Sequence, residues 1–335
     1  TLKFFASYLR HRVQYVRYNG KLSACFIASS GVPRGSKLAP FSFTAVQNDL
    51  GSLLFYAFLL SFADDTKIYR AVSTAADCEY LQEDLDAVVC WAEQSRLRIN
   101  ITKSEVMSYT RRRKIIDFVY SVGSVPLKRV TSVKDLGIIF DPKLNFNLHI
   151  DYISKKAFKA LGFLLRNTSR LYDIDAMMML YSTLVRSGLE YGSIIWSSNT
   201  KKMCRRIEKI QDRFVRIMFY RFNGFYPSFP NHIGYNDLLS HLGLESLSAR
   251  RTTADLLFLH KLFHSQIADS QLLGNLSISV PHPILRTRVR PLFSVDFLPR
   301  NSNLYRMVSS FNQHSSALDI SDSFNAFRKQ VKALV

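Results

Sequence analysis

The stretch Phe62-Ala63-Asp64-Asp65-Thr66-Lys67-Ile68-Tyr69 places two adjacent carboxylates between two apolar, β-prone runs, residues 53–62 and 66–72. This pattern predicts a β-hairpin with the two aspartates at its tip. Adjacent carboxylates repel each other and add nothing to the stability of a turn. A divalent cation removes the repulsion, and Mg²⁺ prefers oxygen ligands of this kind. Asp64 and Asp65 are therefore candidate metal ligands. An isolated Asp-Asp pair is most often part of a polar loop. The surrounding sequence must therefore show whether this pair is a metal site.

Composition and charge narrow the class of protein. The 335 residues include 45 Lys or Arg against 26 Asp or Glu, so the formal net charge is +19. This surplus indicates a polyanionic partner, nucleic acid in preference to an anionic membrane. Four scattered cysteines are too few for a disulfide framework. The longest nearly unbroken apolar run, residues 53–63, is about half as long as a membrane-spanning helix. We therefore expect neither a secreted nor a membrane protein, and cysteines that are kept reduced.

The charge is unevenly distributed along the chain. No acidic residue precedes Asp49, acidic residues dominate from there to Glu93, and basic residues return over residues 96–134 and 155–216. An acidic island between basic stretches is expected where a metal centre acts on a phosphate backbone that its surroundings hold. The acidic residues between 77 and 93 fit a solvated helix face. Asp64 and Asp65 are therefore the acidic residues of this stretch that remain candidates for a metal site.

Hydrophobic periodicity predicts a mixed β/α half followed by a helical half. Thr74 and Asp77 are spaced as a capping box that begins a helix. We assign Asp84 and Asp86 on that helix, and Asp49 ahead of it, to structure. Two later signals are also assigned to structure, a pair of histidines four residues apart and a methionine run that fits a core. The predicted features are a hairpin at Asn19-Gly20, a helix over residues 38–50, strands over residues 97–109, 118–122 and 133–140, His260 with His264, and Met177-Met178-Met179.

Four further motifs accompany the aspartate pair in a fixed order. They are Gly31-Val32-Pro33-Arg34-Gly35-Ser36, Asn48-Asp49-Leu50, Leu97-Arg98-Ile99-Asn100-Ile101-Thr102-Lys103-Ser104, and Leu136-Gly137-Ile138-Ile139-Phe140-Asp141. Together with the aspartates, this ordered set resembles the palm of reverse transcriptases, specifically those of non-LTR (LINE-type, jockey-like) retrotransposons. Leu189-Glu190-Tyr191-Gly192 and residues 207–216 resemble the thumb of the same elements, and Arg286-Thr287-Arg288 with residues 324–335 resembles the region that follows it.

The resemblance implies an α+β fold in three parts. Residues 1–145 would form a partial polymerase palm, an antiparallel sheet with helices. Residues 146–222 would form a helical thumb, and residues 223–335 a helical and irregular C-terminal region. The implied activity is RNA-directed DNA synthesis on an RNA template and a DNA primer from deoxynucleoside triphosphates. The resemblance also implies a location in the nucleus or cytoplasm.

The resemblance also implies roles for individual residues in catalysis. Asp64 and Asp65 would hold two catalytic Mg²⁺ ions, with Asp64 the more essential. Lys103 matches the lysine near the triphosphate, where it could donate a proton to the departing pyrophosphate. The loop packed against the template base and the incoming nucleotide would consist of Gly31, Pro33, Arg34, Gly35 and Ser36.

Two further segments would hold the nucleic acid. Leu136-Gly137 matches the hairpin that grips the primer end. Basic helices between residues 155 and 216 would contact the template–primer duplex through its phosphates, without reading sequence. The residues singled out on the first of these helices are Lys155, Lys156 and Lys159.

Two departures from the family pattern limit the prediction. Arg34 stands where the family usually has Gln. The family also has a third catalytic carboxylate on a strand ahead of the Gly31 loop, where this chain has no acid. We therefore expect a truncated enzyme that is inactive alone. Two other hypotheses stay open: a non-catalytic, basic nucleic-acid-binding remnant of a decayed element, and a basic scaffold in which the Asp64-Asp65 turn is incidental.

Overall fold

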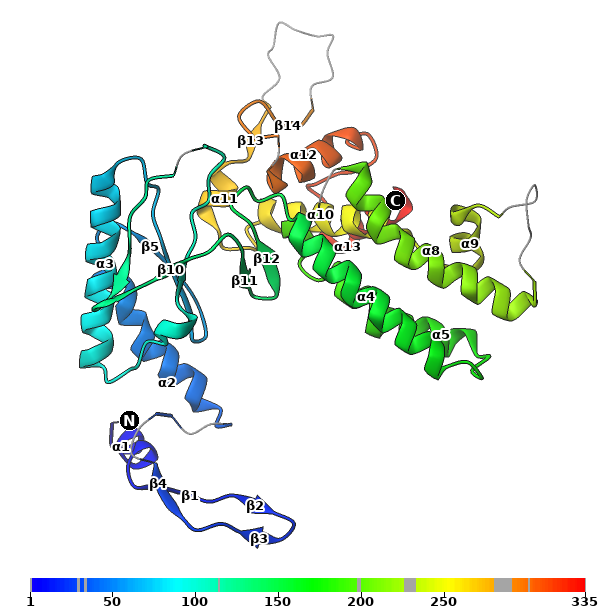
Figure 1. Ribbon diagram of the computed structural model, residues 1–335. Helices are drawn as coiled ribbons and strands as arrows, with labels where there is room; N and C mark the ends of the chain where they lie inside the picture. The colour runs from blue at the N-terminus through cyan, green and yellow to red at the C-terminus, as the bar shows by residue number, and fades with distance from the viewer. Residues whose placement is uncertain are drawn as a thin grey trace, which may run out of the picture. The chain divides into compact units, whose positions relative to one another are not determined.

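A computed structural model describes residues 2–28, 31–32, 35–113, 115–197, 200–225, 233–279, 291–300 and 302–334. The chain divides into two compact units, Thr1–Thr131 and Ser132–Val335, here called the N-terminal unit and the C-terminal unit. Each is described by itself (Figure 1). The division into residues 1–145, 146–222 and 223–335 stays a prediction.

The N-terminal unit combines short strands with three α-helices among its described residues. In chain order the elements are α1 (Leu2–Leu9), β1 (Arg12–Gln14), β2 (Arg17–Tyr18), β3 (Lys21–Leu22), β4 (Phe26–Ala28), α2 (Leu38–Gln47), the 3₁₀-helix η1 (Asn48–Leu53), β5 (Phe58–Phe62), β6 (Asp65–Tyr69), α3 (Ala75–Gln94), the 3₁₀-helix η2 (Ile101–Lys103), β7 (Glu105–Val106), β8 (Ser121–Val122), β9 (Val125–Pro126) and β10 (Lys128–Arg129).

Two hairpins of this unit were predicted and are confirmed. β2 and β3 pair antiparallel around Asn19-Gly20, and both turn residues have positive φ, 45° and 76°, as a type I′ turn requires. β5 and β6 pair from Phe58 opposite Tyr69 to Phe62 opposite Asp65, which leaves two residues in the turn. The prediction of a strand over residues 53–57 is wrong, because three backbone N–H groups of that segment donate to Asp84 instead of to a neighbouring strand.

α3 begins with the predicted capping box. The Thr74 hydroxyl accepts from the Asp77 backbone N–H, and the Asp77 carboxylate accepts from the Thr74 backbone N–H. The predicted strand over residues 97–109 is wrong for most of its length. The backbone N–H groups of Lys103 and Ser104 donate three residues back, to Asn100 and Ile101, and so form the 3₁₀ turn η2 in place of an extended strand.

The C-terminal unit is mostly helical, as the periodicity predicted. Its elements are β11 (Val133–Asp135), β12 (Ile138–Phe140), α4 (Asn147–Asn167), α5 (Ile174–Tyr181), the π-helical turn η3 (Ser182–Arg186), α6 (Ser187–Glu190), α7 (Ser193–Trp196), α8 (Lys201–Asn223), α9 (Tyr235–His241), α10 (Leu247–Phe263), α11 (Ser270–Gly274), β13 (Ser277–Ile278), β14 (Phe293–Ser294), α12 (Asn303–Gln313) and α13 (Phe324–Leu334).

Two hydrophobic clusters hold this unit together. The first joins α4, α5, α8 and α9, and at its centre the rings of Tyr181 and Phe214 stack with centroids 4.0 Å apart. The second joins α10, α12 and α13 around Phe311 and Phe327. Met177 is fully buried in the first cluster, as predicted, whereas Met179 is 68% exposed because it lies on the opposite side of α5.

The two histidines predicted to be structural lie beside this second cluster. His260 Nε2 lies 2.8 Å from the Asp322 carbonyl oxygen, and His264 Nε2 lies 2.8 Å from the Ile320 carbonyl oxygen. Both rings thus tie α10 to the segment ahead of α13. Across the described residues the sheets are two-stranded pairs, all antiparallel except β7 with β10, and the predicted α+β class is confirmed.

Candidate active site and nucleic-acid interface

Asp64 and Asp65 lie at the exposed tip of the β5–β6 hairpin. The turn consists of Ala63 and Asp64, and Ala63 has a positive φ of 52°, a conformation that costs a residue with a Cβ atom free energy. A two-residue hairpin turn of type II′ needs positive φ at its first residue, where glycine is usual. The turn therefore presents two carboxylates to solvent in a conformation that sequence preference alone would not select.

Buried and half-buried charges anchor the base of this hairpin to α3. Asp84 is 2% exposed, and its carboxylate accepts the backbone N–H groups of Phe55, Tyr56 and Ala57 at 2.9, 2.9 and 2.6 Å. The expectation that Asp84 is structural is thereby confirmed. The anchor fixes where β5 begins, and through the register of the hairpin it fixes where the aspartate turn lies.

A second anchor uses Arg70, directly after β6. Its guanidinium donates to the Asp77 carboxylate at 3.0 Å and to the Tyr56 carbonyl oxygen. Hydrogen bonds from the Ser73 backbone and from Arg70 hold the pKa of Asp77 well below its usual range, so this carboxylate stays ionised. Nearer the turn, the Gln47 amide donates to the Thr66 hydroxyl at 3.0 Å and joins the end of α2 to β6.

The Gly31 loop precedes the other end of α2. Gly31 and Gly35 have φ of 75° and 81°, and at both positions an added Cβ would meet no atom within 4 Å. Arg12 donates to the Gly31 carbonyl oxygen at 2.6 Å, and the Tyr8 hydroxyl donates to Ser36. Pro33 and Arg34 lie outside the described residues.

The loop and the aspartate turn thus have different neighbours. The loop is held by α1 and β1, whereas the turn is joined to the far end of α2, a helix of ten residues that spans about 15 Å. Lys103 is exposed at the end of η2. The proposed grouping of the loop, the aspartates and Lys103 in one centre stays a prediction.

Leu136 and Gly137, in the C-terminal unit, form the two-residue turn of the β11–β12 hairpin. Their φ values are 43° and 88°, and the turn is of type I′. The Tyr191 hydroxyl donates to the Leu136 carbonyl oxygen at 3.0 Å, and a Cβ added at Gly137 would lie 3.3 Å from the Tyr191 ring. The neighbouring Gly192 has φ of 64° and lies so close to Ile138 that a Cβ would approach its Cδ1 atom to 2.7 Å.

Tyr191 and Gly192 therefore hold this turn in position. This role was not predicted from the sequence. The one available signal was Gly192, since glycine permits a close approach of the backbone that any other residue would obstruct. Behind the turn, the Ile139 backbone N–H donates to Nδ1 of the buried His149 at 3.3 Å. Burial, and then the charge of Lys134, lower the pKa of His149, so the ring is held neutral.

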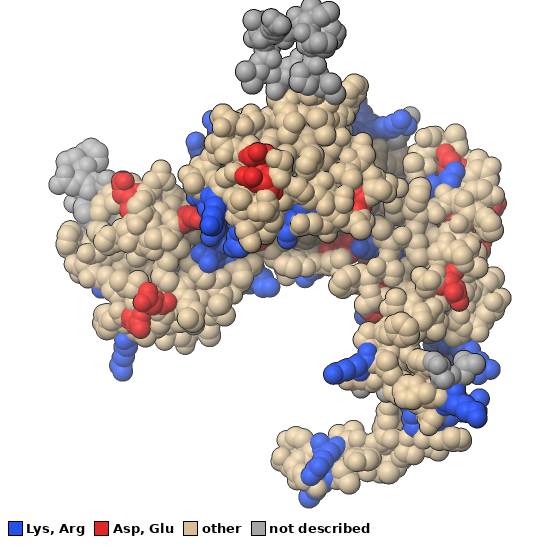
Figure 2. Space-filling model, turned by 180° about the vertical axis from the view of Figure 1, so that it is seen from behind, with Lys and Arg blue, Asp and Glu red and all other residues tan. Residues whose placement is uncertain are grey.

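The exposed side of α4 carries the predicted duplex-binding lysines. Lys155, Lys156 and Lys159 are all exposed, while the buried residues of α4 face the first hydrophobic cluster. Near them Lys134 lies over the Tyr152 ring, 5.0 Å from its centroid, and its hydrogen bond lowers the pKa of the Tyr152 hydroxyl. Figure 2 shows further Lys and Arg side chains on the C-terminal unit, and only basic charges on the arm formed by β1–β4.

Comparison with known families assigns the first half of the chain. Residues 2–165 match the model of the family described as reverse transcriptase (RNA-dependent DNA polymerase). This segment belongs to the reverse transcriptase family. The reverse transcriptase segment contains the Gly31 loop, the aspartate turn, Lys103, the Leu136-Gly137 turn and most of α4.

Curated relatives extend the match. The chain is 27% identical over 220 residues to the probable RNA-directed DNA polymerase from transposon X-element of Drosophila melanogaster, a region covering 63% of this chain and 24% of that protein. It is 27% identical over 222 residues to the RNA-directed DNA polymerase from mobile element jockey of the same organism, with the same two shares. The chain thus spans about a quarter of the length of these relatives, and no solved structure matches it. The predicted resemblance to jockey-like reverse transcriptases is confirmed.

Reverse transcriptases use divalent metal ions and act on a nucleic-acid template and nucleotides. The donors of the reverse transcriptase segment fit such an ion in kind, because Asp64 and Asp65 offer carboxylate oxygens at an exposed turn. Within the described ranges, no third His, Cys, Asp or Glu joins them in a group that could hold a metal. The same residues include no helix with the length and apolar character that crossing a membrane requires.

Proposed function

We propose that the chain forms part of the RNA-directed DNA polymerase of a non-LTR retrotransposon and contributes the aspartate turn of its catalytic centre. One observation carries this proposal. Two adjacent, exposed carboxylates stand on a hairpin tip that α3 anchors through Asp84, inside the segment that matches the family. The anchor explains how so short a hairpin keeps both carboxylates in place for substrate.

The reaction is a nucleotidyl transfer. The primer 3′-hydroxyl oxygen attacks the α-phosphorus of a deoxynucleoside triphosphate, a new P–O bond forms, and the bond to pyrophosphate breaks. Asp64 and Asp65 would hold the two Mg²⁺ ions, which when bound neutralise the charge that develops on the phosphate oxygens. Lys103 would donate a proton to the departing pyrophosphate.

The remaining predicted residues would hold the substrates. The open space around Gly31 and Gly35 supports close approach of a base pair to the loop backbone. The Leu136-Gly137 turn would hold the primer end, with Tyr191 and Gly192 fixing its position. The exposed lysines of α4 would contact phosphates of the RNA–DNA duplex.

Primer extension on an RNA template tests the catalytic assignment. Because no third carboxylate among the described residues joins Asp64 and Asp65, we expect residues 1–335 alone to incorporate little, and Mg²⁺-dependent incorporation once a palm strand with a further aspartate is joined ahead of Thr1. In that active protein Asp64→Ala should abolish incorporation, whereas Asp86→Ala, an exposed carboxylate on α3, should not. Full activity of the Asp64→Ala variant would refute the assignment.

A second candidate is nucleic-acid binding without catalysis. The basic side of α4 favours it, since those lysines would bind a duplex whether or not the catalytic centre is complete. Duplex binding by residues 1–335, together with no incorporation even after the palm strand is joined, would support this candidate over the first.

A further inference from the structure

A cavity of about 280 Å³ opens in the C-terminal unit, outside the matched reverse transcriptase segment. Its walls come from α6 and α7, from the first half of α10 and from α13. The charged residues among its lining are Glu190, Glu245, Arg250, Arg251, Arg328 and Lys332. Four cations thus face two carboxylates around a space larger than a single phosphate group.

Arg251 is the unusual member of this set. It is only 4% exposed, and both of its terminal nitrogens, Nη1 and Nη2, are buried without a hydrogen-bond partner among the described residues. A buried guanidinium that donates no hydrogen bonds is costly, and folded proteins seldom leave one without an anion. Arg251 therefore offers two unused hydrogen-bond donors, which suit an anion.

The nearest carboxylate on the same helix is already occupied. Asp255, one turn after Arg251, accepts two hydrogen bonds from Arg306, at 2.7 and 3.0 Å. Arg306 also donates to the carbonyl oxygens of Ile194 and Ser197 at 2.8 and 2.7 Å. The charge of Arg251 acts on Asp255 as well, but the hydrogen bonds of Asp255 go to Arg306, so both terminal nitrogens of Arg251 keep unused donors among the described residues.

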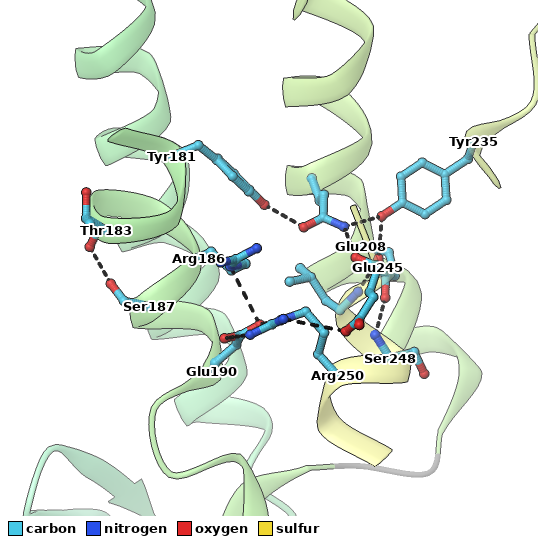
Figure 3. A network of polar contacts seen from close by, with 12 residues as sticks. Tyr181, Thr183, Arg186, Ser187, Glu190, Glu208, Tyr235, Glu245, Ser248 and Arg250 are labelled. Atoms are coloured by element: carbon cyan, nitrogen blue, oxygen red, sulfur yellow. Dashed lines mark hydrogen bonds and ion pairs between the residues drawn. The ribbon is translucent and has the colours of Figure 1, made fainter. Parts of the chain in front are cut away.

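The two carboxylates of the cavity are occupied as well. Figure 3 shows Arg250 between Glu190 and Glu245. Arg250 donates to both oxygens of Glu190 and lies 3.5 Å from the Glu245 carboxylate, while Arg186 approaches Glu190 to 4.0 Å from the other side. Arg328 and Lys332 stand exposed on α13 at the rim.

We propose that this cavity binds a backbone phosphate of a nucleic-acid strand through the Arg251 guanidinium. A guanidinium presents its donors in a planar fork that matches phosphate oxygens. The exposed Arg328 and Lys332 continue the positive charge from the cavity outward, which suits a chain of phosphates better than an isolated anion. The choice of nucleic acid as the source of the phosphate rests on the proposed function, whereas the anion site does not.

Inorganic phosphate is the first probe, added to the full chain at constant ionic strength and followed by the thermal unfolding midpoint and by calorimetric titration. Saturable binding is expected. Arg251→Met should weaken it at least tenfold and should not lower the midpoint without phosphate, because methionine removes two buried nitrogens that have no hydrogen-bond partner and keeps much of the volume. Arg300→Met, an exposed arginine outside the cavity, is the matched control and should bind phosphate as the parent does.

A single-stranded oligonucleotide is the second probe. Arg251→Met and the double variant Arg328→Gln/Lys332→Gln should each lower its affinity several-fold, and inorganic phosphate should compete with it. Absence of saturable phosphate binding, or equal binding by Arg251→Met, would overturn the site. Phosphate binding without any effect of these variants on the oligonucleotide, or equal competition by poly-glutamate, would overturn its assignment to nucleic acid. Phosphate binding at Arg251 requires no nucleotide incorporation, so its outcome is independent of the primer-extension test and failure of the polymerase proposal remains distinguishable.

Discussion

At the scale of single residues, the aspartate turn depends on a backbone conformation that its own sequence disfavours. Ala63 has a φ of 52°, a conformation that glycine adopts without steric cost. Ala63→Gly should therefore stabilise the hairpin by about 1 kcal/mol, measured by native-state hydrogen exchange of the β5 and β6 amides. Ala76→Gly, in the first turn of α3, should destabilise by a similar amount. Equal signs for the two variants would contradict the strain at Ala63.

His149 should give the C-terminal unit a pH-dependent stability. Its pKa is lowered in the folded protein, so the unfolded chain binds more protons as the pH falls through the ordinary value of 6.5. The full stability is therefore present above pH 6.5 and is lost as the pH falls below it, toward the lowered pKa of the folded state. His149→Asn keeps an acceptor for the Ile139 N–H but cannot titrate, so its urea midpoint should fall less between pH 7.5 and 5.5. An unchanged slope would exclude His149 as the cause.

At the scale of elements, one carboxylate decides where β5 begins. Asp84→Ala should destabilise the N-terminal unit by about 3 kcal/mol or more, because three backbone N–H groups lose a charged acceptor in a buried place. Asp86→Ala, two residues further along α3 and exposed, should change stability by less than about 1 kcal/mol. Urea unfolding of both variants is the measurement. Similar losses would show that the contacts of Asp84 are dispensable.

Asp84 also shows why the sequence predicted some elements and not others. Hairpins and caps rest on residues close together in the chain, so Asn19-Gly20, the aspartate turn and the Thr74–Asp77 box could be predicted from spacing. The unpaired segment ahead of β5 depends on a contact 27 to 29 residues away, which periodicity does not record. The role of Tyr191 was not predicted for the same reason, since its hydrogen-bond partner Leu136 lies 55 residues away in the sequence.

At the scale of the whole molecule, a net charge of +19 should make the binding of nucleic acid strongly dependent on salt concentration. Each lysine that contacts a phosphate contributes about one unit to the slope of log affinity against log salt concentration. Replacing Lys155, Lys156 and Lys159 together by Gln should therefore lower the slope for an RNA–DNA duplex by about two to three units. The slope would be measured by fluorescence anisotropy between low and physiological salt.

The matched control is Lys329→Gln, a single exposed lysine on α13 outside the cavity lining. If the total charge alone attracted the duplex, each lysine removed would count equally wherever it lay, and the triple variant would lose three times what the control loses. If α4 is the interface, the control should leave the slope nearly unchanged while the triple variant loses most of it. A flat slope in the parent protein would favour the scaffold hypothesis, because a scaffold with an incidental aspartate turn has no phosphates to neutralise.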